Sequence, residues 1–197
     1  MKNKKAEMGI GTLIIFIAMI LVAAIAASVL IQTATSLQNK ALQTGERSKT
    51  QVSTNILPIV VYGEDGSNDN ALENFVVKAK LSPGSDSVTF DDLLLEFSLK
   101  NGSEDLEYNS SLPSCNETNA SQHGYDAYAV EVLIEGDNYK PGYLQRGDVV
   151  KICFESERSV QEDESVSITL APKVGSPTSI DTALPDIITE KRITIYP

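Results

Sequence analysis

The feature that most constrains this chain is a long segment near its start that contains no charged residue. The segment runs from Met8 to Asn39, and its first part, Met8 to Ile31, is almost entirely apolar. As an α-helix rising about 1.5 Å per residue, that part is long enough to cross the hydrocarbon core of a bilayer. Lysines precede it, and basic residues there hold that end of a helix in the cytoplasm, which leaves the rest of the chain outside.

The chain after this segment is acidic. Residues 51–197 contain 10 Lys and Arg against 25 Asp and Glu, and the whole chain of 197 residues has a net charge of −11. Affinity for nucleic acid comes from clustered Lys and Arg, so we expect no nucleic-acid partner. The chain has a single His and two well-separated Cys. It therefore lacks the residues for zinc chemistry or His-dependent nucleophilic catalysis, and we expect no catalytic residue, no metal site and no cofactor.

Three kinds of segment could produce such an apolar run: a cleaved secretory signal, a plain membrane anchor, or a helix that later packs against copies of itself. A secretory signal has an apolar stretch of roughly 7 to 15 residues, which is shorter than this one. A loose helical pattern continues to about Thr54, so the helix would be far longer than a bilayer requires. The extra length favours a bundle of parallel helices, in which small residues allow close approach. An anchor with a helical stalk remains the alternative.

The rest of the chain has the alternating apolar pattern and the β-branched residues that are typical of strands. Spacers rich in Gly, Ser, Asn and Asp separate the candidate strands. We expect strands at 56–62, 74–81, 93–99, 128–135, 148–154, 165–172 and 192–197. The predicted fold class is therefore α+β: a long N-terminal hydrophobic α-helix followed by an antiparallel immunoglobulin-like β-sandwich.

Several stretches resemble those of a known family. The chain begins with KKAEMGIGTLIIFIAMILVAAIAASVLIQT at residues 4–33, and later contains LQRGDVVKICF, EDESVSITLAPKVG and a terminal ITIYP. These stretches resemble archaeal flagellins (archaellins), the filament subunits of the archaellum, which belong to the type IV pilin-like superfamily. The resemblance covers both ends of the chain and leaves a variable centre.

The resemblance implies that the chain is made with a short basic leader. In the family, a prepilin-type signal peptidase removes a leader that ends in a basic pair and a Gly. Here Lys4 and Lys5 are the basic pair, Ala6 replaces the usual Gly, and Glu7 would become the first mature residue; cleavage after Lys5 is the alternative. The chain then divides into a leader at 1–6, a hydrophobic helix at 7–54 that is first a membrane anchor and then filament core, and an outer β-sandwich at 55–197.

The resemblance also implies function, location and partners. The chain would polymerise with itself, or with other archaellins, into an extracellular helical filament used for swimming, after insertion of its precursor in the membrane. An assembly ATPase and a membrane platform would drive assembly and rotation. An adhesive pilin with the same helix, and a membrane-anchored extracellular binding module, are the alternative functions. Small or bulky residues expected to pack between helices in the filament are Gly9, Gly11, Phe16, Ala23, Ala24 and Ala27.

Two further features of the outer part can be interpreted from the residues alone. Cys115 and Cys153 lie outside the membrane, where a disulfide can persist, and we expect a bridge from a loop to a strand; two free thiols are the alternative. Four N-x-[ST] sites cluster within about 20 residues of polar sequence. We expect N-glycosylation there, at Asn101, Asn109, Asn116 and Asn119.

Overall fold

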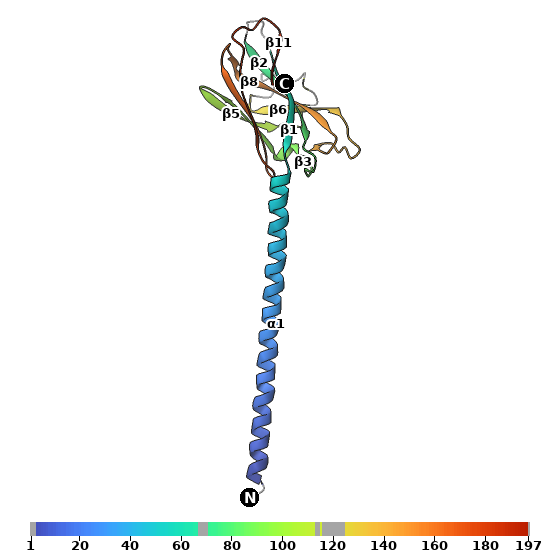
Figure 1. Ribbon diagram of the computed structural model, residues 1–197, viewed down its shortest axis with the longest axis vertical. Coiled ribbons are helices and arrows are strands. Elements are labelled where there is room, and N and C mark those ends of the chain that lie inside the picture. The colour runs from blue at the N-terminus through green and yellow to red at the C-terminus, as the bar shows by residue number, and fades with distance from the viewer. Residues whose placement is uncertain (1–2, 67–70, 113–114, 116–124, 197) are drawn as a thin grey trace. The chain divides into compact units, whose positions relative to one another are not determined.

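The structure is a computed structural model that describes residues 3–66, 71–112, 115 and 125–196 (Figure 1). The chain separates into two compact units, Met1–Ser48 and Lys49–Pro197, and each is described by itself. The first is helical, and the second contains the last turn of the helix and all the strands.

A single unbroken helix, α1, spans Asn3–Ser53. It contains no Pro, and Ala, Leu, Ile and Met dominate its first half. Its threonines do not interrupt it, because their hydroxyls donate hydrogen bonds to carbonyls one turn earlier: Thr12 to Gly9 at 3.0 Å and Thr35 to Ile31 at 2.9 Å. Such bonds satisfy a hydroxyl within the helix itself, so these polar residues are compatible with apolar surroundings.

The second unit is built from strands with short connections. A 3-10 turn, η1 (Phe90–Asp92), leads into β4. The strands are β1 (Ile56–Glu64), β2 (Leu72–Leu81), β3 (Val88–Thr89), β4 (Leu93–Leu99), β5 (Gly102–Tyr108), β6 (Ala127–Ile134), β7 (Tyr143–Leu144), β8 (Val149–Val160), β9 (Ser165–Pro172), β10 (Thr178–Ala183) and β11 (Arg192–Tyr196).

Nine strands are hydrogen-bonded in the order β10-β9-β4-β5-β6-β8-β2-β1-β11, and β3 pairs separately with β7. Every described pairing is antiparallel except the short parallel contact between β5 and β6. The sheet folds over at this contact into two layers, which we call the β8 sheet (β6, β8, β2, β1, β11) and the β9 sheet (β5, β4, β9, β10). At the far edges the layers approach again, where the Thr182 hydroxyl donates to the Ile195 carbonyl at 3.2 Å.

Aromatic side chains join the two layers at the centre of the core. The ring of Phe97 on β4 lies 4.7 Å from that of Phe75 on β2 and 5.2 Å from that of Phe154 on β8, centroid to centroid. All three residues are fully buried, and burying each contributes about 1.5–3 kcal/mol. The buried hydroxyl of Tyr128 donates to the carbonyls of Phe90 and Leu93, at 3.0 and 2.7 Å.

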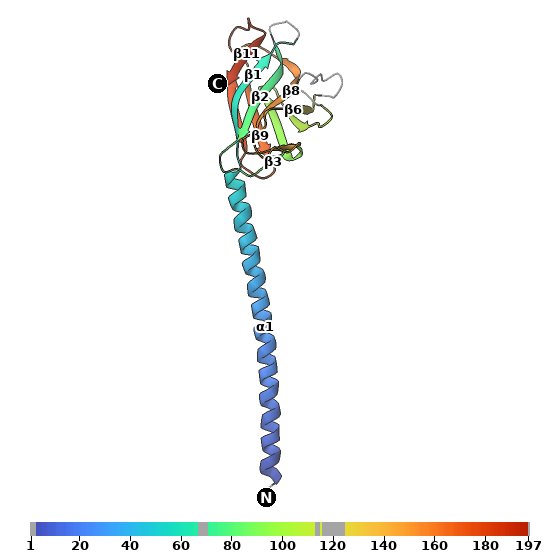
Figure 2. The ribbon, with the colours of Figure 1, turned by 90° about the vertical axis from the view of Figure 1, so that its right-hand side faces the viewer.

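The long helix followed by a mostly antiparallel β-sandwich confirms the predicted fold class. Figure 2 shows β1, β2 and β8 side by side, in agreement with their pairing. Four strands were missed, β5 and β10 of the sandwich and the two-residue strands β3 and β7, and β8 continues to Val160 beyond its expected end. The parallel contact of β5 with β6 also departs from a purely antiparallel sandwich, because the chain crosses over between these two strands instead of turning back in a tight hairpin.

Candidate assembly helix and its anchorage

The uncharged part of α1 exposes its apolar side chains. In the single chain, Ile15 is 69% exposed and Phe16 61%, and every residue from 8 to 48 is exposed. By length and composition, Met8–Ser53 is the one described helix able to cross a membrane, with a mean hydropathy of 3.1 in its most apolar window; a signal sequence would pass the same test. Such a surface is stable only in lipid or against other apolar surfaces.

The residues expected to pack between helices lie on this exposed stretch. At 100° per residue, Gly9, Phe16, Ala23 and Ala27 fall within about 40° of one another and form one face. Ala24 borders that face, whereas Gly11 lies on nearly the opposite side. Added methyl groups at Gly9 and Gly11 would meet nothing within 4 Å in the single chain. Four of the six predicted residues therefore share one face, which carries three small residues and one aromatic ring.

The predicted leader residues, Lys4, Lys5, Ala6 and Glu7, lie in the first turns of α1. The helix thus continues across the expected cleavage position between Ala6 and Glu7.

The last turn of the helix is fastened to the sandwich within the second unit. Ser85 is fully buried in the loop after β2. Its hydroxyl donates a hydrogen bond to the Ser53 carbonyl at 3.1 Å and accepts one from the backbone N–H of Asn55 at 3.1 Å. The Ser82 amide donates to the Asn55 carbonyl at 2.9 Å. The Asp86 amide donates to the Thr54 hydroxyl at 3.3 Å. One loop of the β8 sheet therefore satisfies most of the polar backbone where the helix ends.

A second loop, between β9 and β10, holds the same residues. The Ser176 amide donates to the Thr54 carbonyl at 2.9 Å, and the Thr178 hydroxyl hydrogen-bonds the Asn55 side chain at 2.6 Å. Gly175 has φ +144°, and a methyl group there would lie 2.7 Å from the Thr54 carbonyl oxygen. Only glycine combines that backbone conformation with so close an approach. We call residues 53–55 with these two loops the joint.

The sequence analysis identified none of the joint residues. Its members are short polar side chains within Ser-, Pro- and Gly-rich stretches that look like ordinary turns. The cluster of Ser, Thr and Asn around the end of the predicted helix was the available signal, because such side chains cap and bridge backbone groups.

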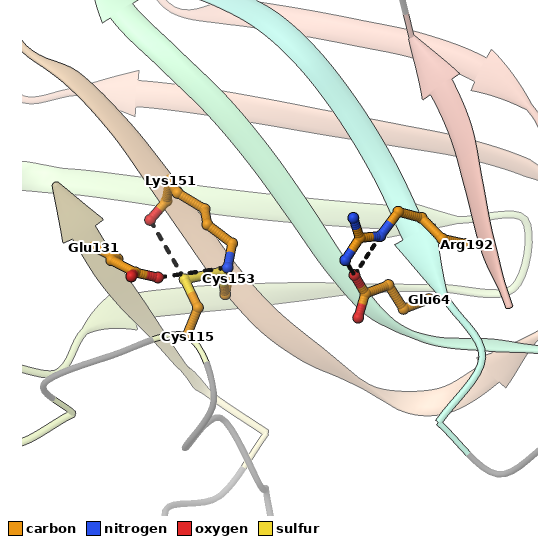
Figure 3. The surroundings of a disulfide bond; sticks show 6 residues. All are labelled: Glu64, Cys115, Glu131, Lys151, Cys153 and Arg192. Carbon is orange, nitrogen blue, oxygen red and sulfur yellow. Dashed lines mark hydrogen bonds and ion pairs between the residues drawn. A yellow bond between two sulfur atoms is a disulfide. The ribbon is translucent and has the colours of Figure 1, made fainter. Parts of the chain in front are cut away.

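The predicted bridge between Cys115 and Cys153 is present, and it fastens a loop to β8 on the outer face of the β8 sheet (Figure 3). Both cysteines join a small apolar cluster there with Val60, Tyr62 and Val76. Burial raises the pKa of the Tyr62 phenol, and the Arg192 guanidinium over its ring partly opposes the increase. Cys115 therefore contributes to a second, smaller core outside the sandwich.

Two of the four glycosylation sites lie in the described part of the chain. Asn101 is exposed in the turn between β4 and β5. Asn109 is half-buried directly after β5, and its side-chain oxygen accepts the Ser111 amide at 3.0 Å. Among the described residues, no hydrogen bond engages its side-chain nitrogen, which is the atom that a glycan would modify. Asn116 and Asn119 lie outside the described residues.

The described part of the chain offers few candidates for a metal site or a ligand pocket. No cluster of three or more His, Cys, Asp or Glu is arranged there to hold a metal ion. One surface hollow of about 510 Å³ is lined by acidic residues, Tyr108 and Lys173. The Lys173 ammonium already pairs with Asp92 at 2.8 Å, and this pairing lowers the pKa of Asp92.

Comparison with known proteins places these features in context. Residues 6–182 match the family described as archaeal-type flagellin. The chain is 30% identical over 190 residues to flagellin B3 of Halobacterium salinarum, covering 96% of this chain and 94% of that protein. It is 31% identical over 208 residues to flagellin B1 of Methanococcus voltae, covering 97% and 95%. Among solved structures, it is similar to the archaeal flagellum of Methanospirillum hungatei, with a TM-score of 0.70, 15% identity, and coverage of 96% of this chain and 99% of that one.

Proposed function

The chain belongs to the archaeal-type flagellin family, and from that premise we propose how its parts act as a structural subunit of the extracellular archaellum filament. The observation that carries the proposal is α1, whose apolar surface is exposed along its whole uncharged length. In a polymer, that surface is shielded from water, and each Å² of apolar surface so buried stabilises the polymer by about 25 cal/mol. The helices then form a hydrophobic core, and the sandwiches form the outside.

In this proposal the chain has three parts. Residues 1–6 are a leader, residues 7–54 are the helix that serves first as membrane anchor and then as filament core, and residues 55–197 are the outer domain. The basic leader keeps its end of the precursor in the cytoplasm. A prepilin-type signal peptidase cuts between Ala6 and Glu7, and its removal of the leader frees the helix to leave the lipid.

The helix face of Gly9, Phe16, Ala23 and Ala27 packs against neighbouring helices, with Gly11 and Ala24 at contacts beside it. Glycans on Asn101, Asn109, Asn116 and Asn119 cover the outer surface. An assembly ATPase and a membrane platform supply the energy and the torque. The subunit itself hydrolyses nothing and serves as a mechanical element.

Mass spectrometry of the N-terminus of material sheared from intact cells tests this proposal. We expect a mature chain that begins at Glu7, together with added glycan mass over residues 101–121. Ala6→Gly should be cleaved normally, whereas Ala6→Leu should retain the leader and abolish filaments, because the leucine side chain does not fit at a bond that requires a small residue.

Chain found only in detergent extracts of membranes, with the leader intact, would overturn the proposal and favour a tethered binding domain. Deletion of the gene should stop swimming and leave surface attachment intact. The opposite phenotype would indicate an adhesive pilin.

A further inference from the structure

The outer face of the β8 sheet carries three lysines, Lys78, Lys80 and Lys151. Lys78 on β2 is directly opposite Lys151 on β8, and Lys80 is two residues further along the same face of β2. Glu131 pairs with Lys151 at 3.4 Å (Figure 3). Among the described residues, no ion pair reaches Lys78 or Lys80; the Lys78 ammonium lies 5.7 Å from the centre of the Tyr62 ring. Like charges directly opposite across two strands destabilise the isolated domain.

The outer face of the β9 sheet has the same arrangement with the opposite charge. Glu96 on β4 is directly opposite Asp105 on β5, and neither has an ion pair within the described part of the chain. Glu107 and Asp181 are exposed on the same face. Beside these acidic residues, β9 and β10 present small hydroxyl side chains, including Ser167 and Ser179, so this face carries an excess of negative charge.

We infer that these two faces meet between adjacent copies of this chain in the filament: Lys78 and Lys80 of one copy against Glu96 and Asp105 of the next. This inference rests on the proposed function, because it requires a polymer. Lys78 and Lys80 on one face and Glu96 and Asp105 on the other have no ion pair among the described residues, and they become paired when the opposite face is placed against them. The two faces lie on opposite sides of the sandwich, separated by its core.

A second copy fits these faces better than an unrelated partner, because both halves of the contact are present on the same chain. Contacts between two different faces of identical subunits are heterologous, and they extend into open helical filaments when the rotation does not close. A chain of net charge −11 repels its copies, so dense packing requires a place where opposite charges meet. Complementary charges of this kind fix register and partner choice, while the buried helices supply most of the affinity.

Charge reversal in the full-length chain, expressed in place of the native protein, tests the contact. The basic-face variant combines Lys78→Glu with Lys80→Glu, and the acidic-face variant combines Glu96→Lys with Asp105→Lys. Each should lower the yield of sheared filament at least about tenfold, as expected for like charges forced together at a repeated contact. A chain with all four reversals restores opposite charges at the contact and should recover filament yield to near the wild-type value.

The matched control for the basic-face variant makes the same change in net charge at loop positions off both faces. Lys140→Glu with Lys191→Glu meets this condition, since both lysines are exposed in connections between strands. This control should assemble like the wild type. Urea unfolding of each variant in detergent separates folding from assembly. We expect no midpoint below that of the wild type, because reversing Lys78 removes a like-charge pair and reversing both Glu96 and Asp105 exchanges one like-charge pair for another.

Carbodiimide cross-linking of wild-type filaments gives an independent readout. It joins an amine directly to a carboxylate, and here it should link Lys78 or Lys80 to Glu96 or Asp105. Such a link must connect two copies, because within one chain the two faces point away from each other across layers about 10 Å apart.

Filaments that form normally from both face variants and give no such cross-link would refute the contact and leave the filament function intact. Failure of the wild-type chain to form filaments would instead refute the proposed function itself.

Discussion

The disulfide between Cys115 and Cys153 gives the most quantitative prediction about the outer domain. The bridge closes a loop with a sequence separation of 38 residues. In the chain-entropy model, such a loop restricts the unfolded chain enough to stabilise the folded state by about 4 kcal/mol. Replacing both cysteines with alanine should therefore lower the free energy of unfolding of the sandwich by about that amount.

Urea unfolding of the full-length chain in detergent measures this change. With an m-value of about 2 kcal/mol/M, a loss of about 4 kcal/mol lowers the midpoint by about 2 M. The transition can be followed by tyrosine fluorescence, because the chain has seven Tyr and no Trp. A reducing agent should shift the wild-type midpoint by the same amount and leave that of the alanine variant unchanged.

A shift below about 0.5 M, which corresponds to about 1 kcal/mol at this m-value, would refute the reasoning. It would mean that other contacts already hold the loop. The structure shows two candidates at its start: Leu112 is buried, and the Asn109 amide donates to the Tyr128 carbonyl at 3.1 Å.

Three further changes test separate features by the same unfolding assay. Ser85→Ala should cost about 1–3 kcal/mol because it leaves buried backbone groups of the joint unsatisfied, whereas the exposed Ser87→Ala should have no effect. Tyr128→Phe should also cost about 1–3 kcal/mol, since the buried Leu93 carbonyl loses a donor and the Phe90 carbonyl keeps only the backbone N–H of Leu93. The Arg158 guanidinium lowers the pKa of Glu164 in the folded chain. The pair therefore stabilises the fold fully above the unfolded carboxyl pKa of about 4.3, and this contribution is lost as the pH falls through the lower pKa of the folded state. Glu164→Gln should flatten the acid side of the plot of unfolding free energy against pH.

The helix and the central strands were predictable because their signals are local. Strands β4 and β9 have the predicted bounds, 93–99 and 165–172, since their apolar residues alternate along each strand. Strand β5 was missed because it contains one buried apolar residue, Leu106, among acidic and small residues. Its strand conformation depends on pairing with β4, where Leu106 is opposite Leu95. That pairing partner cannot be read from the segment itself.

The joint was less predictable still, because its members come from three distant parts of the chain. Ser85 lies 30 residues from Asn55, and Thr178 lies 123 residues from it. Hydroxyl side chains have no periodic pattern, and their partners here are backbone atoms whose positions follow from the whole sandwich. The disulfide, in contrast, was accessible to simple reasoning, since two cysteines outside the membrane have one possible pairing.

The arrangement of the joint has a mechanical consequence for a filament subunit. Residues 53–55 are held by the loop after β2, which belongs to the β8 sheet, and by the loop between β9 and β10, which belongs to the β9 sheet. A load that enters the outer domain at residue 54 is therefore shared between both layers of the sandwich. Without these bonds, the same load would pass through β1 alone. The bonds of the two loops therefore act in parallel with β1, and both layers of the sandwich hold the end of the helix.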